Sequence, residues 1–495
     1  MAKYKPIERG QGYFLTIYPE EIFDDTSIEK IIDKFIDEYA DMTPFDKKYK
    51  NDKVGQKAIA PQAKLKAIIY GFSQGIESMR KVEKMLQLNH PGFLFLSGGR
   101  TIDHSTLCYF INDFHDEITA IFGRLLLLLE DLNLIDWRRV MIDGTKISSN
   151  ASKEFTRNKK GFEKKLKHYE NLSAKLLDRA KKASELKEDG EISEEELKKE
   201  KELIERQQKH YNQIINKIKL YEEELKKEDV SPETKVNLTD SESRLLKKDE
   251  TFIQGYNVQA AFSANDILLS IEATSKGNDM DLLSHMVEKV ESVKKNNKVT
   301  TGSAYLLDKG YFNISQISEL IQEGKDLYIP PPSQFDNSWF IQEKHQVLVE
   351  NDGVYFLCKD QRKKKGWFEK TDNKFVFSLD RKFCAGCESI SSCWKENAKS
   401  RKFTISKTYI ENKELWFNYR DKVKSEEWKY TYNRRIGKEH NFFDLKSNNG
   451  LSRLNWRGKK KCNTISVMAG ITYNLKKLRK AVIDIGWDGA KSAMA

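Results

Sequence analysis

Four residues near the C-terminus have the types and the spacing for chemistry on a phosphate group. Tyr432 is followed by Arg435 three residues later, by Glu439 four residues after that, and by Lys446 seven residues further on. On a helix, steps of this size place side chains on one face. A face with a carboxylate, a pair of cations and a phenol suits a metal ion beside a phosphate backbone and is not typical of a core face. The sequence therefore predicts a nucleic-acid site on one helix.

Asp143 and Asp308, far upstream, share a second pattern. Each follows a short apolar run that we expect to be a buried strand ending at the acid, and a glycine comes within two residues of each. Catalytic groups are often placed at the end of a buried strand. A single strand-end aspartate is more often a turn or capping residue, so the repeated context favours catalysis more than either residue alone.

The order of the elements predicts that the two aspartates meet. We expect strands at 252–262 and 267–273, helices near 279–296 and at 313–323, and a closing helix at 462–482. With insertions at 155–230 and 335–412 set aside, the expected order is a strand with Asp143, two strands, a helix, a strand with Asp308, a helix, a strand and a helix with Glu439. This is the order of an α/β RNase H-like fold, in which the first and fourth strands are neighbours. We therefore expect Asp143, Asp308 and Glu439 to share one catalytic site.

Carboxylates from three places in the chain suit divalent cations. Magnesium prefers oxygen ligands and keeps some of its waters, so a few carboxylates suffice. Two such ions about 3.5–4 Å apart can stabilise both the attacking and the leaving oxygens of a phosphodiester reaction. We expect Asp143 to bridge the ions, with Asp308 and Glu439 each completing one.

These residues resemble those of a known family. The pattern Tyr-x2-Arg-x3-Glu-x6-Lys, formed by the four residues named first, resembles the YREK signature of bacterial insertion-sequence DDE transposases with unchanged spacing. Asp143 and Asp308 look like that family's first and second aspartates, and residues 253–261 are similar to its second-strand segment. The N-terminal region around Asp103–Thr106 resembles its helical domain. The resemblance implies Mg2+ or Mn2+, cutting at terminal inverted repeats, and strand transfer into target DNA.

The segments that must position these residues differ in composition and in the spacing of their apolar residues. Between residues 155 and 228, lysine and glutamate dominate and apolar residues recur at helical and heptad spacing around a turn signal at Asp189–Gly190. This predicts an antiparallel helical hairpin with coiled-coil packing. The hairpin matches no motif of the family, so its role stays open between a solvated arm and an arm that binds DNA or a partner. The segments that we predict are a helical DNA-binding or dimerisation domain at 1–135, core at 136–154, the hairpin at 155–230, core at 231–334, a basic Cys-containing insertion at 335–412, and the end of the core at 413–495.

The overall charge favours a polyanionic partner. The chain of 495 residues has 86 Lys and Arg against 75 Asp and Glu, a net charge of +11 and a pI near 9.0. Double-stranded DNA is the first candidate, and a lysine-rich soluble protein is the plainer alternative. The N-terminus lacks the apolar core of a signal peptide, and the longest aliphatic run, Leu125–Leu129, is too short for a bilayer. We therefore expect a cytoplasmic protein that makes no membrane contact.

Several basic and aromatic residues are candidate DNA contacts. Cations interleaved with aromatic rings suit a DNA groove and base stacking, although a solvated surface is the ordinary alternative. Arg244 follows an expected turn at 240–243 and is a weaker candidate. The predicted contacts are Tyr432, Arg435, Lys446, Arg244, Lys363, Lys364, Lys365, Trp367, Arg457, Lys459 and Lys460.

The cysteines divide into a cluster and two isolated residues. Six cysteines in so long a chain do not form a disulfide framework. A Cys-x2-Cys step with two further thiolates predicts a structural tetrahedral zinc site, with reduced, packed cysteines as the alternative. We expect the isolated Cys108 and Cys462 to be buried as small hydrophobes. The predicted zinc ligands are Cys358, Cys384, Cys387 and Cys393.

Together these features predict a DDE transposase that acts as a homodimer on the ends of its own element. A catalytically silent or domesticated DNA-binding protein derived from a transposase is the main alternative, although all three acids are present. A structural coiled-coil protein would explain residues 155–228 but not the spacing from Tyr432 to Lys446.

Overall fold

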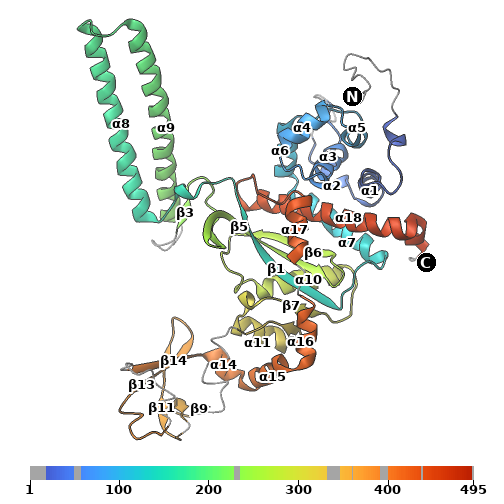
Figure 1. Ribbon diagram of the computed structural model, residues 1–495, viewed down its shortest axis with the longest axis vertical. Coiled ribbons are helices and arrows are strands. Elements are labelled where there is room, and N and C mark those ends of the chain that lie inside the picture. Colours follow the sequence, from blue (N-terminus) through green and yellow to red (C-terminus); the bar gives the residue numbers. More distant parts are fainter. Residues whose placement is uncertain are drawn as a thin grey trace, which may run out of the picture.

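The computed structural model describes residues 18–49, 57–227, 235–331, 346–358, 360–388, 390, 400–435 and 439–492; side chains at 220–227, 439, 485 and 487–492 are outside this description. Figure 1 shows a central sheet, a group of N-terminal helices beside it, a long projecting hairpin and a small β-rich lobe at the other end of the long axis. Each part follows from local sequence patterns.

The N-terminal part is helical, as predicted. Asp103 caps a helix by accepting a hydrogen bond from the Thr106 N–H at 3.0 Å, and proline begins two others at Pro61 and Pro91, where its missing N–H costs nothing. The chain leaves helical geometry between Ser73, where α3 ends, and Met79, where α4 begins. The elements are η1 (Pro19–Glu21), α1 (Ile28–Lys34), η2 (Phe35–Tyr39), α2 (Thr43–Asp46), α3 (Pro61–Ser73), α4 (Met79–Gln87), α5 (Pro91–Leu96), α6 (His104–Asp113) and α7 (His115–Asp131).

A mixed sheet lies at the centre of the chain. Its strands are β1 (Arg139–Ser148), β4 (Arg244–Lys248), β5 (Thr251–Ser263), β6 (Leu268–Thr274), β7 (Ala304–Leu306) and β8 (Asp326–Tyr328). The order is β4-β5-β1-β7-β8, and β6 also pairs with β5. Strand β5 runs antiparallel to its neighbours, whereas β1, β7 and β8 are parallel to one another. The hairpin of β5 and β6 agrees with the prediction for residues 252–273.

Strand β1 is longer than the sequence predicts. We expected it to end at Asp143, but it continues to Ser148 because its antiparallel pairing with β5 extends from Val140 to Ser148. Its parallel pairing with β7 covers only Arg139 to Met141. Asp143 therefore lies within a strand, just beyond the point where one of its two neighbours ends.

Helices cover the sheet and close the core. They are α10 (Leu283–Asn296), α11 (Ile314–Gln322), α14 (Lys407–Glu411), α15 (Lys413–Lys424), α16 (Glu426–Asn433), α17 (Glu439–Asn448) and α18 (Lys459–Ser492). Helix α10 contacts β5 and β6, and α11 and α16 contact β8. Between these elements, η4 (Lys309–Tyr311) follows β7. We predicted α10, α11 and a closing helix at 462–482 with boundaries within a few residues of these, except that α18 extends further.

Helix α18 is the central packing element. It contacts α1, α3, α6 and α7 on the N-terminal side as well as β6 of the sheet, and much of its length is buried (Figure 1). Asn474 accepts a hydrogen bond from the Leu268 N–H at 2.9 Å and donates one to the Leu268 carbonyl at 2.8 Å. Asn463 accepts another from the Ala273 N–H. These amides satisfy part of the backbone edge of β6, which would otherwise be open to pairing.

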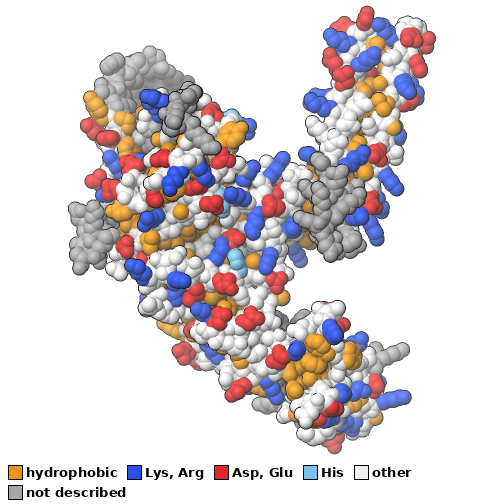
Figure 2. All heavy atoms as spheres, turned by 180° about the vertical axis from the view of Figure 1, so that it is seen from behind, with side chains coloured by type: hydrophobic (Ala, Val, Ile, Leu, Met, Phe, Trp, Pro, Cys, Tyr) orange, Lys and Arg blue, Asp and Glu red, His pale blue; other side chains and the backbone are white. Residues whose placement is uncertain are grey.

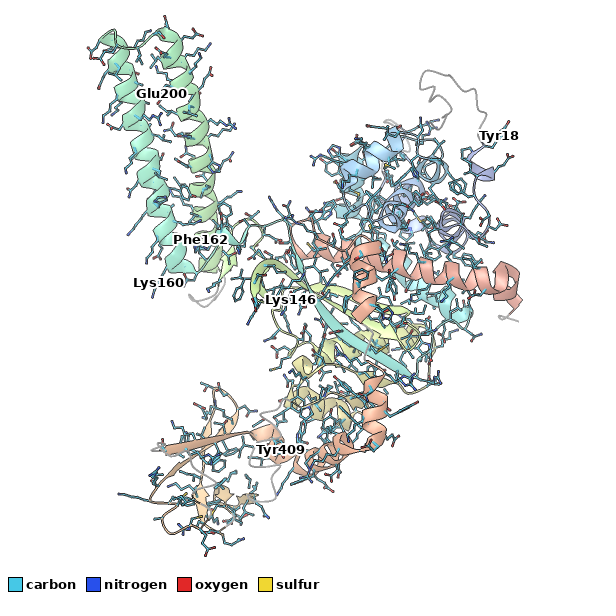
Figure 3. The ribbon with its side chains drawn as sticks, viewed as in Figure 1. Tyr18, Lys146, Lys160, Phe162, Glu200 and Tyr409 are labelled. Carbon is cyan, nitrogen blue, oxygen red and sulfur yellow. The ribbon has the colours of Figure 1, made fainter. Side chains whose placement is uncertain are left out.

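The predicted hairpin is present. Helices α8 (Lys159–Glu188) and α9 (Glu194–Lys227) pack along each other, and Gly190 in the connection has a positive φ of 78°. Phe162 is buried at the base of the hairpin, and Glu200 lies towards the tip (Figure 3). The hairpin leaves and rejoins the core through η3 (Lys153–Phe155) and the short pair β2 (Thr156–Arg157) and β3 (Val236–Asn237).

The described residues of the β-rich lobe form two three-stranded sheets, β11-β10-β9 and β12-β13-β14. Its strands are β9 (Gln346–Glu350), β10 (Gly353–Leu357), β11 (Lys363–Lys365), β12 (Trp367–Glu369), β13 (Lys374–Asp380) and β14 (Ser400–Ser406). Phe356 of one sheet packs against Phe377 and Phe403 of the other, so the two sheets share an aromatic core.

The surface charges and the hydropathy of the described helices match what the amino-acid composition suggests. Lys and Arg side chains alternate with Asp and Glu over the face seen in Figure 2. None of the described helices contains an apolar stretch long enough to cross a bilayer.

Gly255 provides a test of the β1–β5 pairing. A Cβ at this position would lie 2.0 Å from the Ile147 carbonyl oxygen of β1, so we expect Gly255→Ala to lower the free energy of unfolding by about 2 kcal/mol or more. Denaturant unfolding monitored by circular dichroism measures this. The control is Gly123→Ala on the exposed face of α7, where nothing lies within 4 Å, and its stability should rise by up to about 1 kcal/mol. Equal stability of Gly255→Ala and the native protein would contradict this account of the pairing.

Candidate functional site

The register of two parallel strands brings Asp143 and Asp308 together. Met141 of β1 stands opposite Leu306 of β7, so continuing the register by two residues on each strand sets Asp143 opposite Asp308. Neighbouring strands lie about 4.8 Å apart. The charge of Asp308 acts on Asp143, so the two carboxylates are close enough to interact.

Asp143 is held by an arginine from a distant segment. Its Oδ2 lies 3.0 Å from Nη2 of Arg435, and its Oδ1 accepts a hydrogen bond from the Gly144 N–H at 2.9 Å. About a third of the side chain is exposed. Burial nevertheless raises the pKa of Asp143 to about 6, because the nearby charges of Asp308 and Asp279 add to burial and together outweigh Arg435 and the Gly144 N–H.

Asp308 caps the short helix that follows β7. Its Oδ1 accepts a hydrogen bond from the Gly310 N–H at 2.6 Å. A Cβ on Gly310 would lie 2.8 Å from that same oxygen, so the glycine leaves room for the carboxylate. This explains the glycine that follows the acid in the sequence.

A third aspartate, which the sequence did not reveal as a candidate, lies beside the pair. Oδ1 of Asp279 accepts hydrogen bonds from the side-chain amides of Asn257 and Gln259, both at 2.7 Å. The Tyr311 hydroxyl in turn donates to Oε1 of Gln259. A Cβ on Gly144 would lie 2.3 Å from Nε2 of Gln259 and 2.9 Å from Asp279, so this polar network packs directly against β1.

Part of this network could have been recognised from the sequence. Asn257 and Gln259 are polar residues at alternate positions of an otherwise apolar strand, so the sequence places them on the same face of β5. Asp279 had no such signal, because it lies in the connection between β6 and α10, and only the fold sets it against Gly144.

The four residues from Tyr432 to Lys446 do not lie on one helix, which corrects our prediction. Helix α16 ends at Asn433, Arg434 and Arg435 form a turn, and α17 begins at Glu439. The Arg435 N–H donates to the Tyr432 carbonyl at 2.9 Å, which closes the turn. The spacing therefore identified residues that lie near Asp143, although the single helix on which that prediction was based is absent.

Three of these residues surround the acids. Tyr432 stacks on Trp428 with ring centroids 4.8 Å apart, and burial raises the pKa of its phenol. Lys446 is half-buried on α17, and burial together with Lys248 lowers its pKa, whereas Asp143 acts in the opposite direction. With the Arg435 ion pair, the structure thus brings Tyr432, Arg435 and Lys446 to one place. Glu439 is the first residue of α17, and its side chain lies outside the described part.

The other predicted DNA contacts away from the β-rich lobe are mostly engaged within the protein. Nη1 of Arg244 donates to the carbonyls of Ser241 and Ser243, and Nε of Arg457 donates to the Asn150 carbonyl at 3.0 Å. Nζ of Lys459 lies 3.8 Å from Glu272. Lys460 is exposed. Arg244 and Arg457 therefore brace loops, and Lys460 is the cation of this group that is freest to meet a ligand.

The basic run of the β-rich lobe is largely neutralised. Lys363 pairs with Glu350, Lys365 pairs with Asp352, and both lie over the Tyr355 ring. Lys364 lies over the Phe383 ring. Trp367, in contrast, is 49% exposed, so its ring can stack on a base.

The described cysteines do not form the predicted zinc site. Cys358, Cys384 and Cys387 are partly exposed, and the described residues contain no group of three or more His, Cys, Asp or Glu that could hold a metal ion. Cys393 lies outside the described residues, so the zinc site stays a prediction. Cys462 is buried as expected, whereas Cys108 is only partly buried.

The carboxylates suit a divalent cation in their chemistry. Asp143, Asp279 and Asp308 do not by themselves form a group that could hold a metal ion, and Arg435 occupies one oxygen of Asp143. Their charges nevertheless act against one another, and a cation bound beside them would relieve that repulsion. Carboxylate oxygens are the ligands that magnesium prefers. Asp143 and Asp308 could therefore contribute to a metal site.

Two family models match the chain. The Transposase DDE domain matches residues 357–479, and the Transposase domain (DUF772) matches residues 18–113. The pair of matches is typical of insertion-sequence transposases. The families indicate a DNA transposase. The DDE match includes Arg435 and Lys446 but neither Asp143 nor Asp308, and no curated protein matches the chain.

The raised pKa of Asp143 gives the metal-free protein a measurable pH dependence. Since the folded-state pKa of about 6 exceeds the ordinary value of 3.8, the folded state binds more protons between these limits, and stability falls as pH rises through this window. Asp143→Asn removes this loss. The difference in unfolding free energy, variant minus native protein, should therefore rise from pH 4 to pH 7. The rise is at most about 3 kcal/mol, and it is smaller if solvent screens the Asp143 carboxylate. Chemical denaturation with chelator present measures it. A difference that stays constant over this pH range would contradict the raised pKa.

Proposed function

We propose that this protein cuts DNA at the terminal inverted repeats of its insertion sequence and joins the ends to target DNA. The catalytic unit is an RNase H-like core whose sheet order β6-β5-β1-β7-β8 corresponds to the expected order of strands in that fold. The observation that supports this most is that Asp143 of β1 interacts with Asp308, two residues past the end of the adjacent parallel strand β7, and pairs with Arg435.

The proposed catalytic acids are Asp143, Asp308 and Glu439. They would hold two Mg2+ or Mn2+ ions, which supply positive charge for the attacking and leaving oxygens of the phosphodiester. The first two come from the sheet, and Glu439 comes from the start of α17, so two parts of the fold must be in place before the site is complete.

The surrounding residues of the chain hold the acids and the strand. Arg435 holds Asp143 in place while the metal is absent, and its remaining N–H donors can reach a phosphate. Lys446 supplies a second cation beside Asp143, and the stacked Tyr432 ring forms a rigid wall for the strand end. Asp279 acts as a positioning residue because it fixes the Asn257 and Gln259 amides against Gly144.

Further features of the proposal concern assembly. The helical N-terminal domain would bind the element ends, and the exposed Trp367 of the β-rich lobe would stack on DNA. Joining a pair of ends to one target requires a catalytic site for each end, so we propose a homodimer with two-fold symmetry. We also place its action in the cytoplasm, where the DNA of a bacterial element lies.

A catalytically silent DNA-binding protein is the alternative. The pairing of Arg435 with Asp143 favours it, because an arginine in that position can replace a cation permanently. Cleavage of an end duplex in the presence of Mg2+ decides between the two.

The first test removes each acid in turn. We expect Asp143→Asn, Asp308→Asn and Glu439→Gln each to lower the rate of cutting at a labelled end duplex by more than about a thousandfold, because each removes a charge that the transition state needs. Binding of the same duplex, measured by fluorescence anisotropy, should change little. Asp281→Asn is the matched control, since Asp281 is exposed on the surface near the site. Normal cutting by any one variant would remove that residue from the site.

The second test concerns Asp279. We expect Asp279→Asn to raise the Mg2+ concentration needed for half-maximal cutting by about tenfold, as is typical when a residue that orients metal ligands is changed. The measurement is the cutting rate against Mg2+ concentration, with Asp281→Asn again as the control. A variant that loses rate at every Mg2+ concentration without a shift in half-saturation would show a purely structural role.

A further inference from the structure

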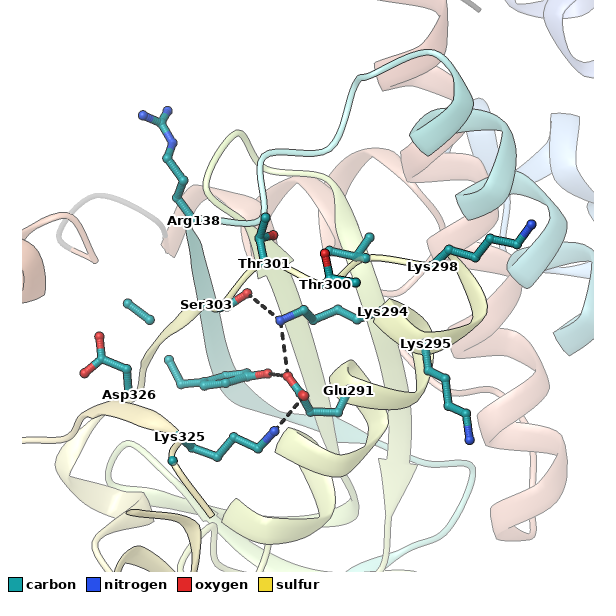
Figure 4. A pocket seen from close by; sticks show the side chains of 15 residues that line it. Arg138, Glu291, Lys294, Lys295, Lys298, Thr300, Thr301, Ser303, Lys325 and Asp326 are labelled. Carbon is teal, nitrogen blue, oxygen red and sulfur yellow. Dashed lines mark hydrogen bonds and ion pairs between the residues drawn. The ribbon is translucent and has the colours of Figure 1, made fainter. Parts of the chain in front are cut away.

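A second polar site lies at the opposite end of the same strands. A pocket lies where the parallel strands β1, β7 and β8 begin (Figure 4), whereas Asp143 and Asp308 lie towards or beyond their carboxyl ends. Its volume is about 770 Å3. Ala304 lines this pocket, and Asp308 is the fourth residue after it along extended chain, a distance of about 13 Å. The pocket is therefore distinct from the site of the acids.

The lining is rich in cations. Five basic side chains face two acidic ones: Arg138, Lys294, Lys295, Lys298 and Lys325 against Glu291 and Asp326. Glu291 is satisfied by Lys325 at 2.6 Å, by Lys294 at 3.4 Å and by the Tyr305 hydroxyl (Figure 4). Asp326 pairs with Lys422, which approaches from α15. Both acids of the pocket are thus already neutralised.

Lys295 and Lys298 are the pocket lysines that neutralise neither of these acids. Both are exposed, and neither forms an ion pair within the described residues. Arg138, in comparison, pairs with Asp136. Positive charge without an internal partner therefore gathers at the end of α10 and in the loop that follows it.

That loop offers further donors. The backbone N–H groups of residues 300–303 donate to no other group in the described part of the chain, and Thr300 and Thr301 add hydroxyls. Ser303 is buried and accepts a hydrogen bond from Lys294 at 3.2 Å. Lysines, hydroxyls and free backbone N–H groups are the donors that proteins use for the phosphates of DNA.

The pocket lacks the means to read a base. Its only aromatic ring belongs to Tyr305, which is buried and whose hydroxyl is occupied by Glu291, so no ring face is exposed for stacking. Recognition there would depend on charge and on the phosphate oxygens, without regard to sequence.

We propose that this pocket binds backbone phosphates of DNA at a second contact, separate from the catalytic edge. The inference rests on the proposed function only in taking DNA as the partner. It assigns a DNA contact to Lys295, Lys298 and the 300–303 loop, which lie at the end of the strands opposite to the acids.

The test is the double variant Lys295→Glu with Lys298→Glu in the full chain. Binding of a labelled duplex of arbitrary sequence is measured by anisotropy across a series of salt concentrations, without divalent metal. We expect the affinity to fall at least tenfold at low salt and the slope of log K against log salt to become shallower by about two, because two phosphate contacts are lost. The control is Lys198→Glu with Lys201→Glu, which makes the same charge change at exposed positions of α9.

Protection from acetylation provides a second measurement. In native protein, duplex DNA should protect Lys295 and Lys298 from acetylation, as read by mass spectrometry, and millimolar inorganic phosphate should protect them less. An unchanged salt slope, an equal loss in the control, or protection by phosphate but not by DNA would each overturn the proposal. None of these measurements requires cutting, so a protein that binds as expected but fails to cut with Mg2+ would refute only the proposed activity.

Discussion

The unequal pairing of β1 is the constraint on which the candidate site depends. The strand is paired with β5 along nearly its whole length, which fixes its position, but it is paired with β7 only over three residues. Asp308 lies two residues past the end of β7, where the chain turns into η4. If β1 were shorter, Asp143 would lie on a free end. The strand lengths thus create an acidic site that is both rigid and open.

Charge within that site is unbalanced in a way that suits its proposed role. Carboxylates repel one another at close range, and burial increases the cost of their ionisation. Arg435 offsets part of this, yet the pKa of Asp143 stays near 6. The fold, rather than attraction between these groups, keeps them together, since the polar network from Tyr311 to Asp279 and the packed β5 strand lie directly behind them. A site of this kind gains stability when a cation enters.

Helix α18 joins the two regions that match transposase families. It begins within the DDE match and packs on α1, α3 and α6 of the helical N-terminal match while its Asn463 and Asn474 hold the edge of β6. One helix therefore carries the packing between the N-terminal helices and the sheet. The hairpin α8–α9 has its own small core around Phe162, and within the described residues it is linked to the sheet through η3 and the short pair of β2 and β3.

The sequence alone determined what depends on local periodicity and residue chemistry: the hairpin with its turn at Asp189–Gly190, the β5–β6 pair, the Asp103 cap, and the acids and cations that the structure gathers. The end of β1, the break between Tyr432 and Glu439, and the membership of Asp279 in the site were decided only by tertiary structure. Strand length depends on which neighbours pair with it, and a loop residue reaches its partners only once distant elements have packed. Such long-range contacts produce no periodic pattern in the amino-acid sequence.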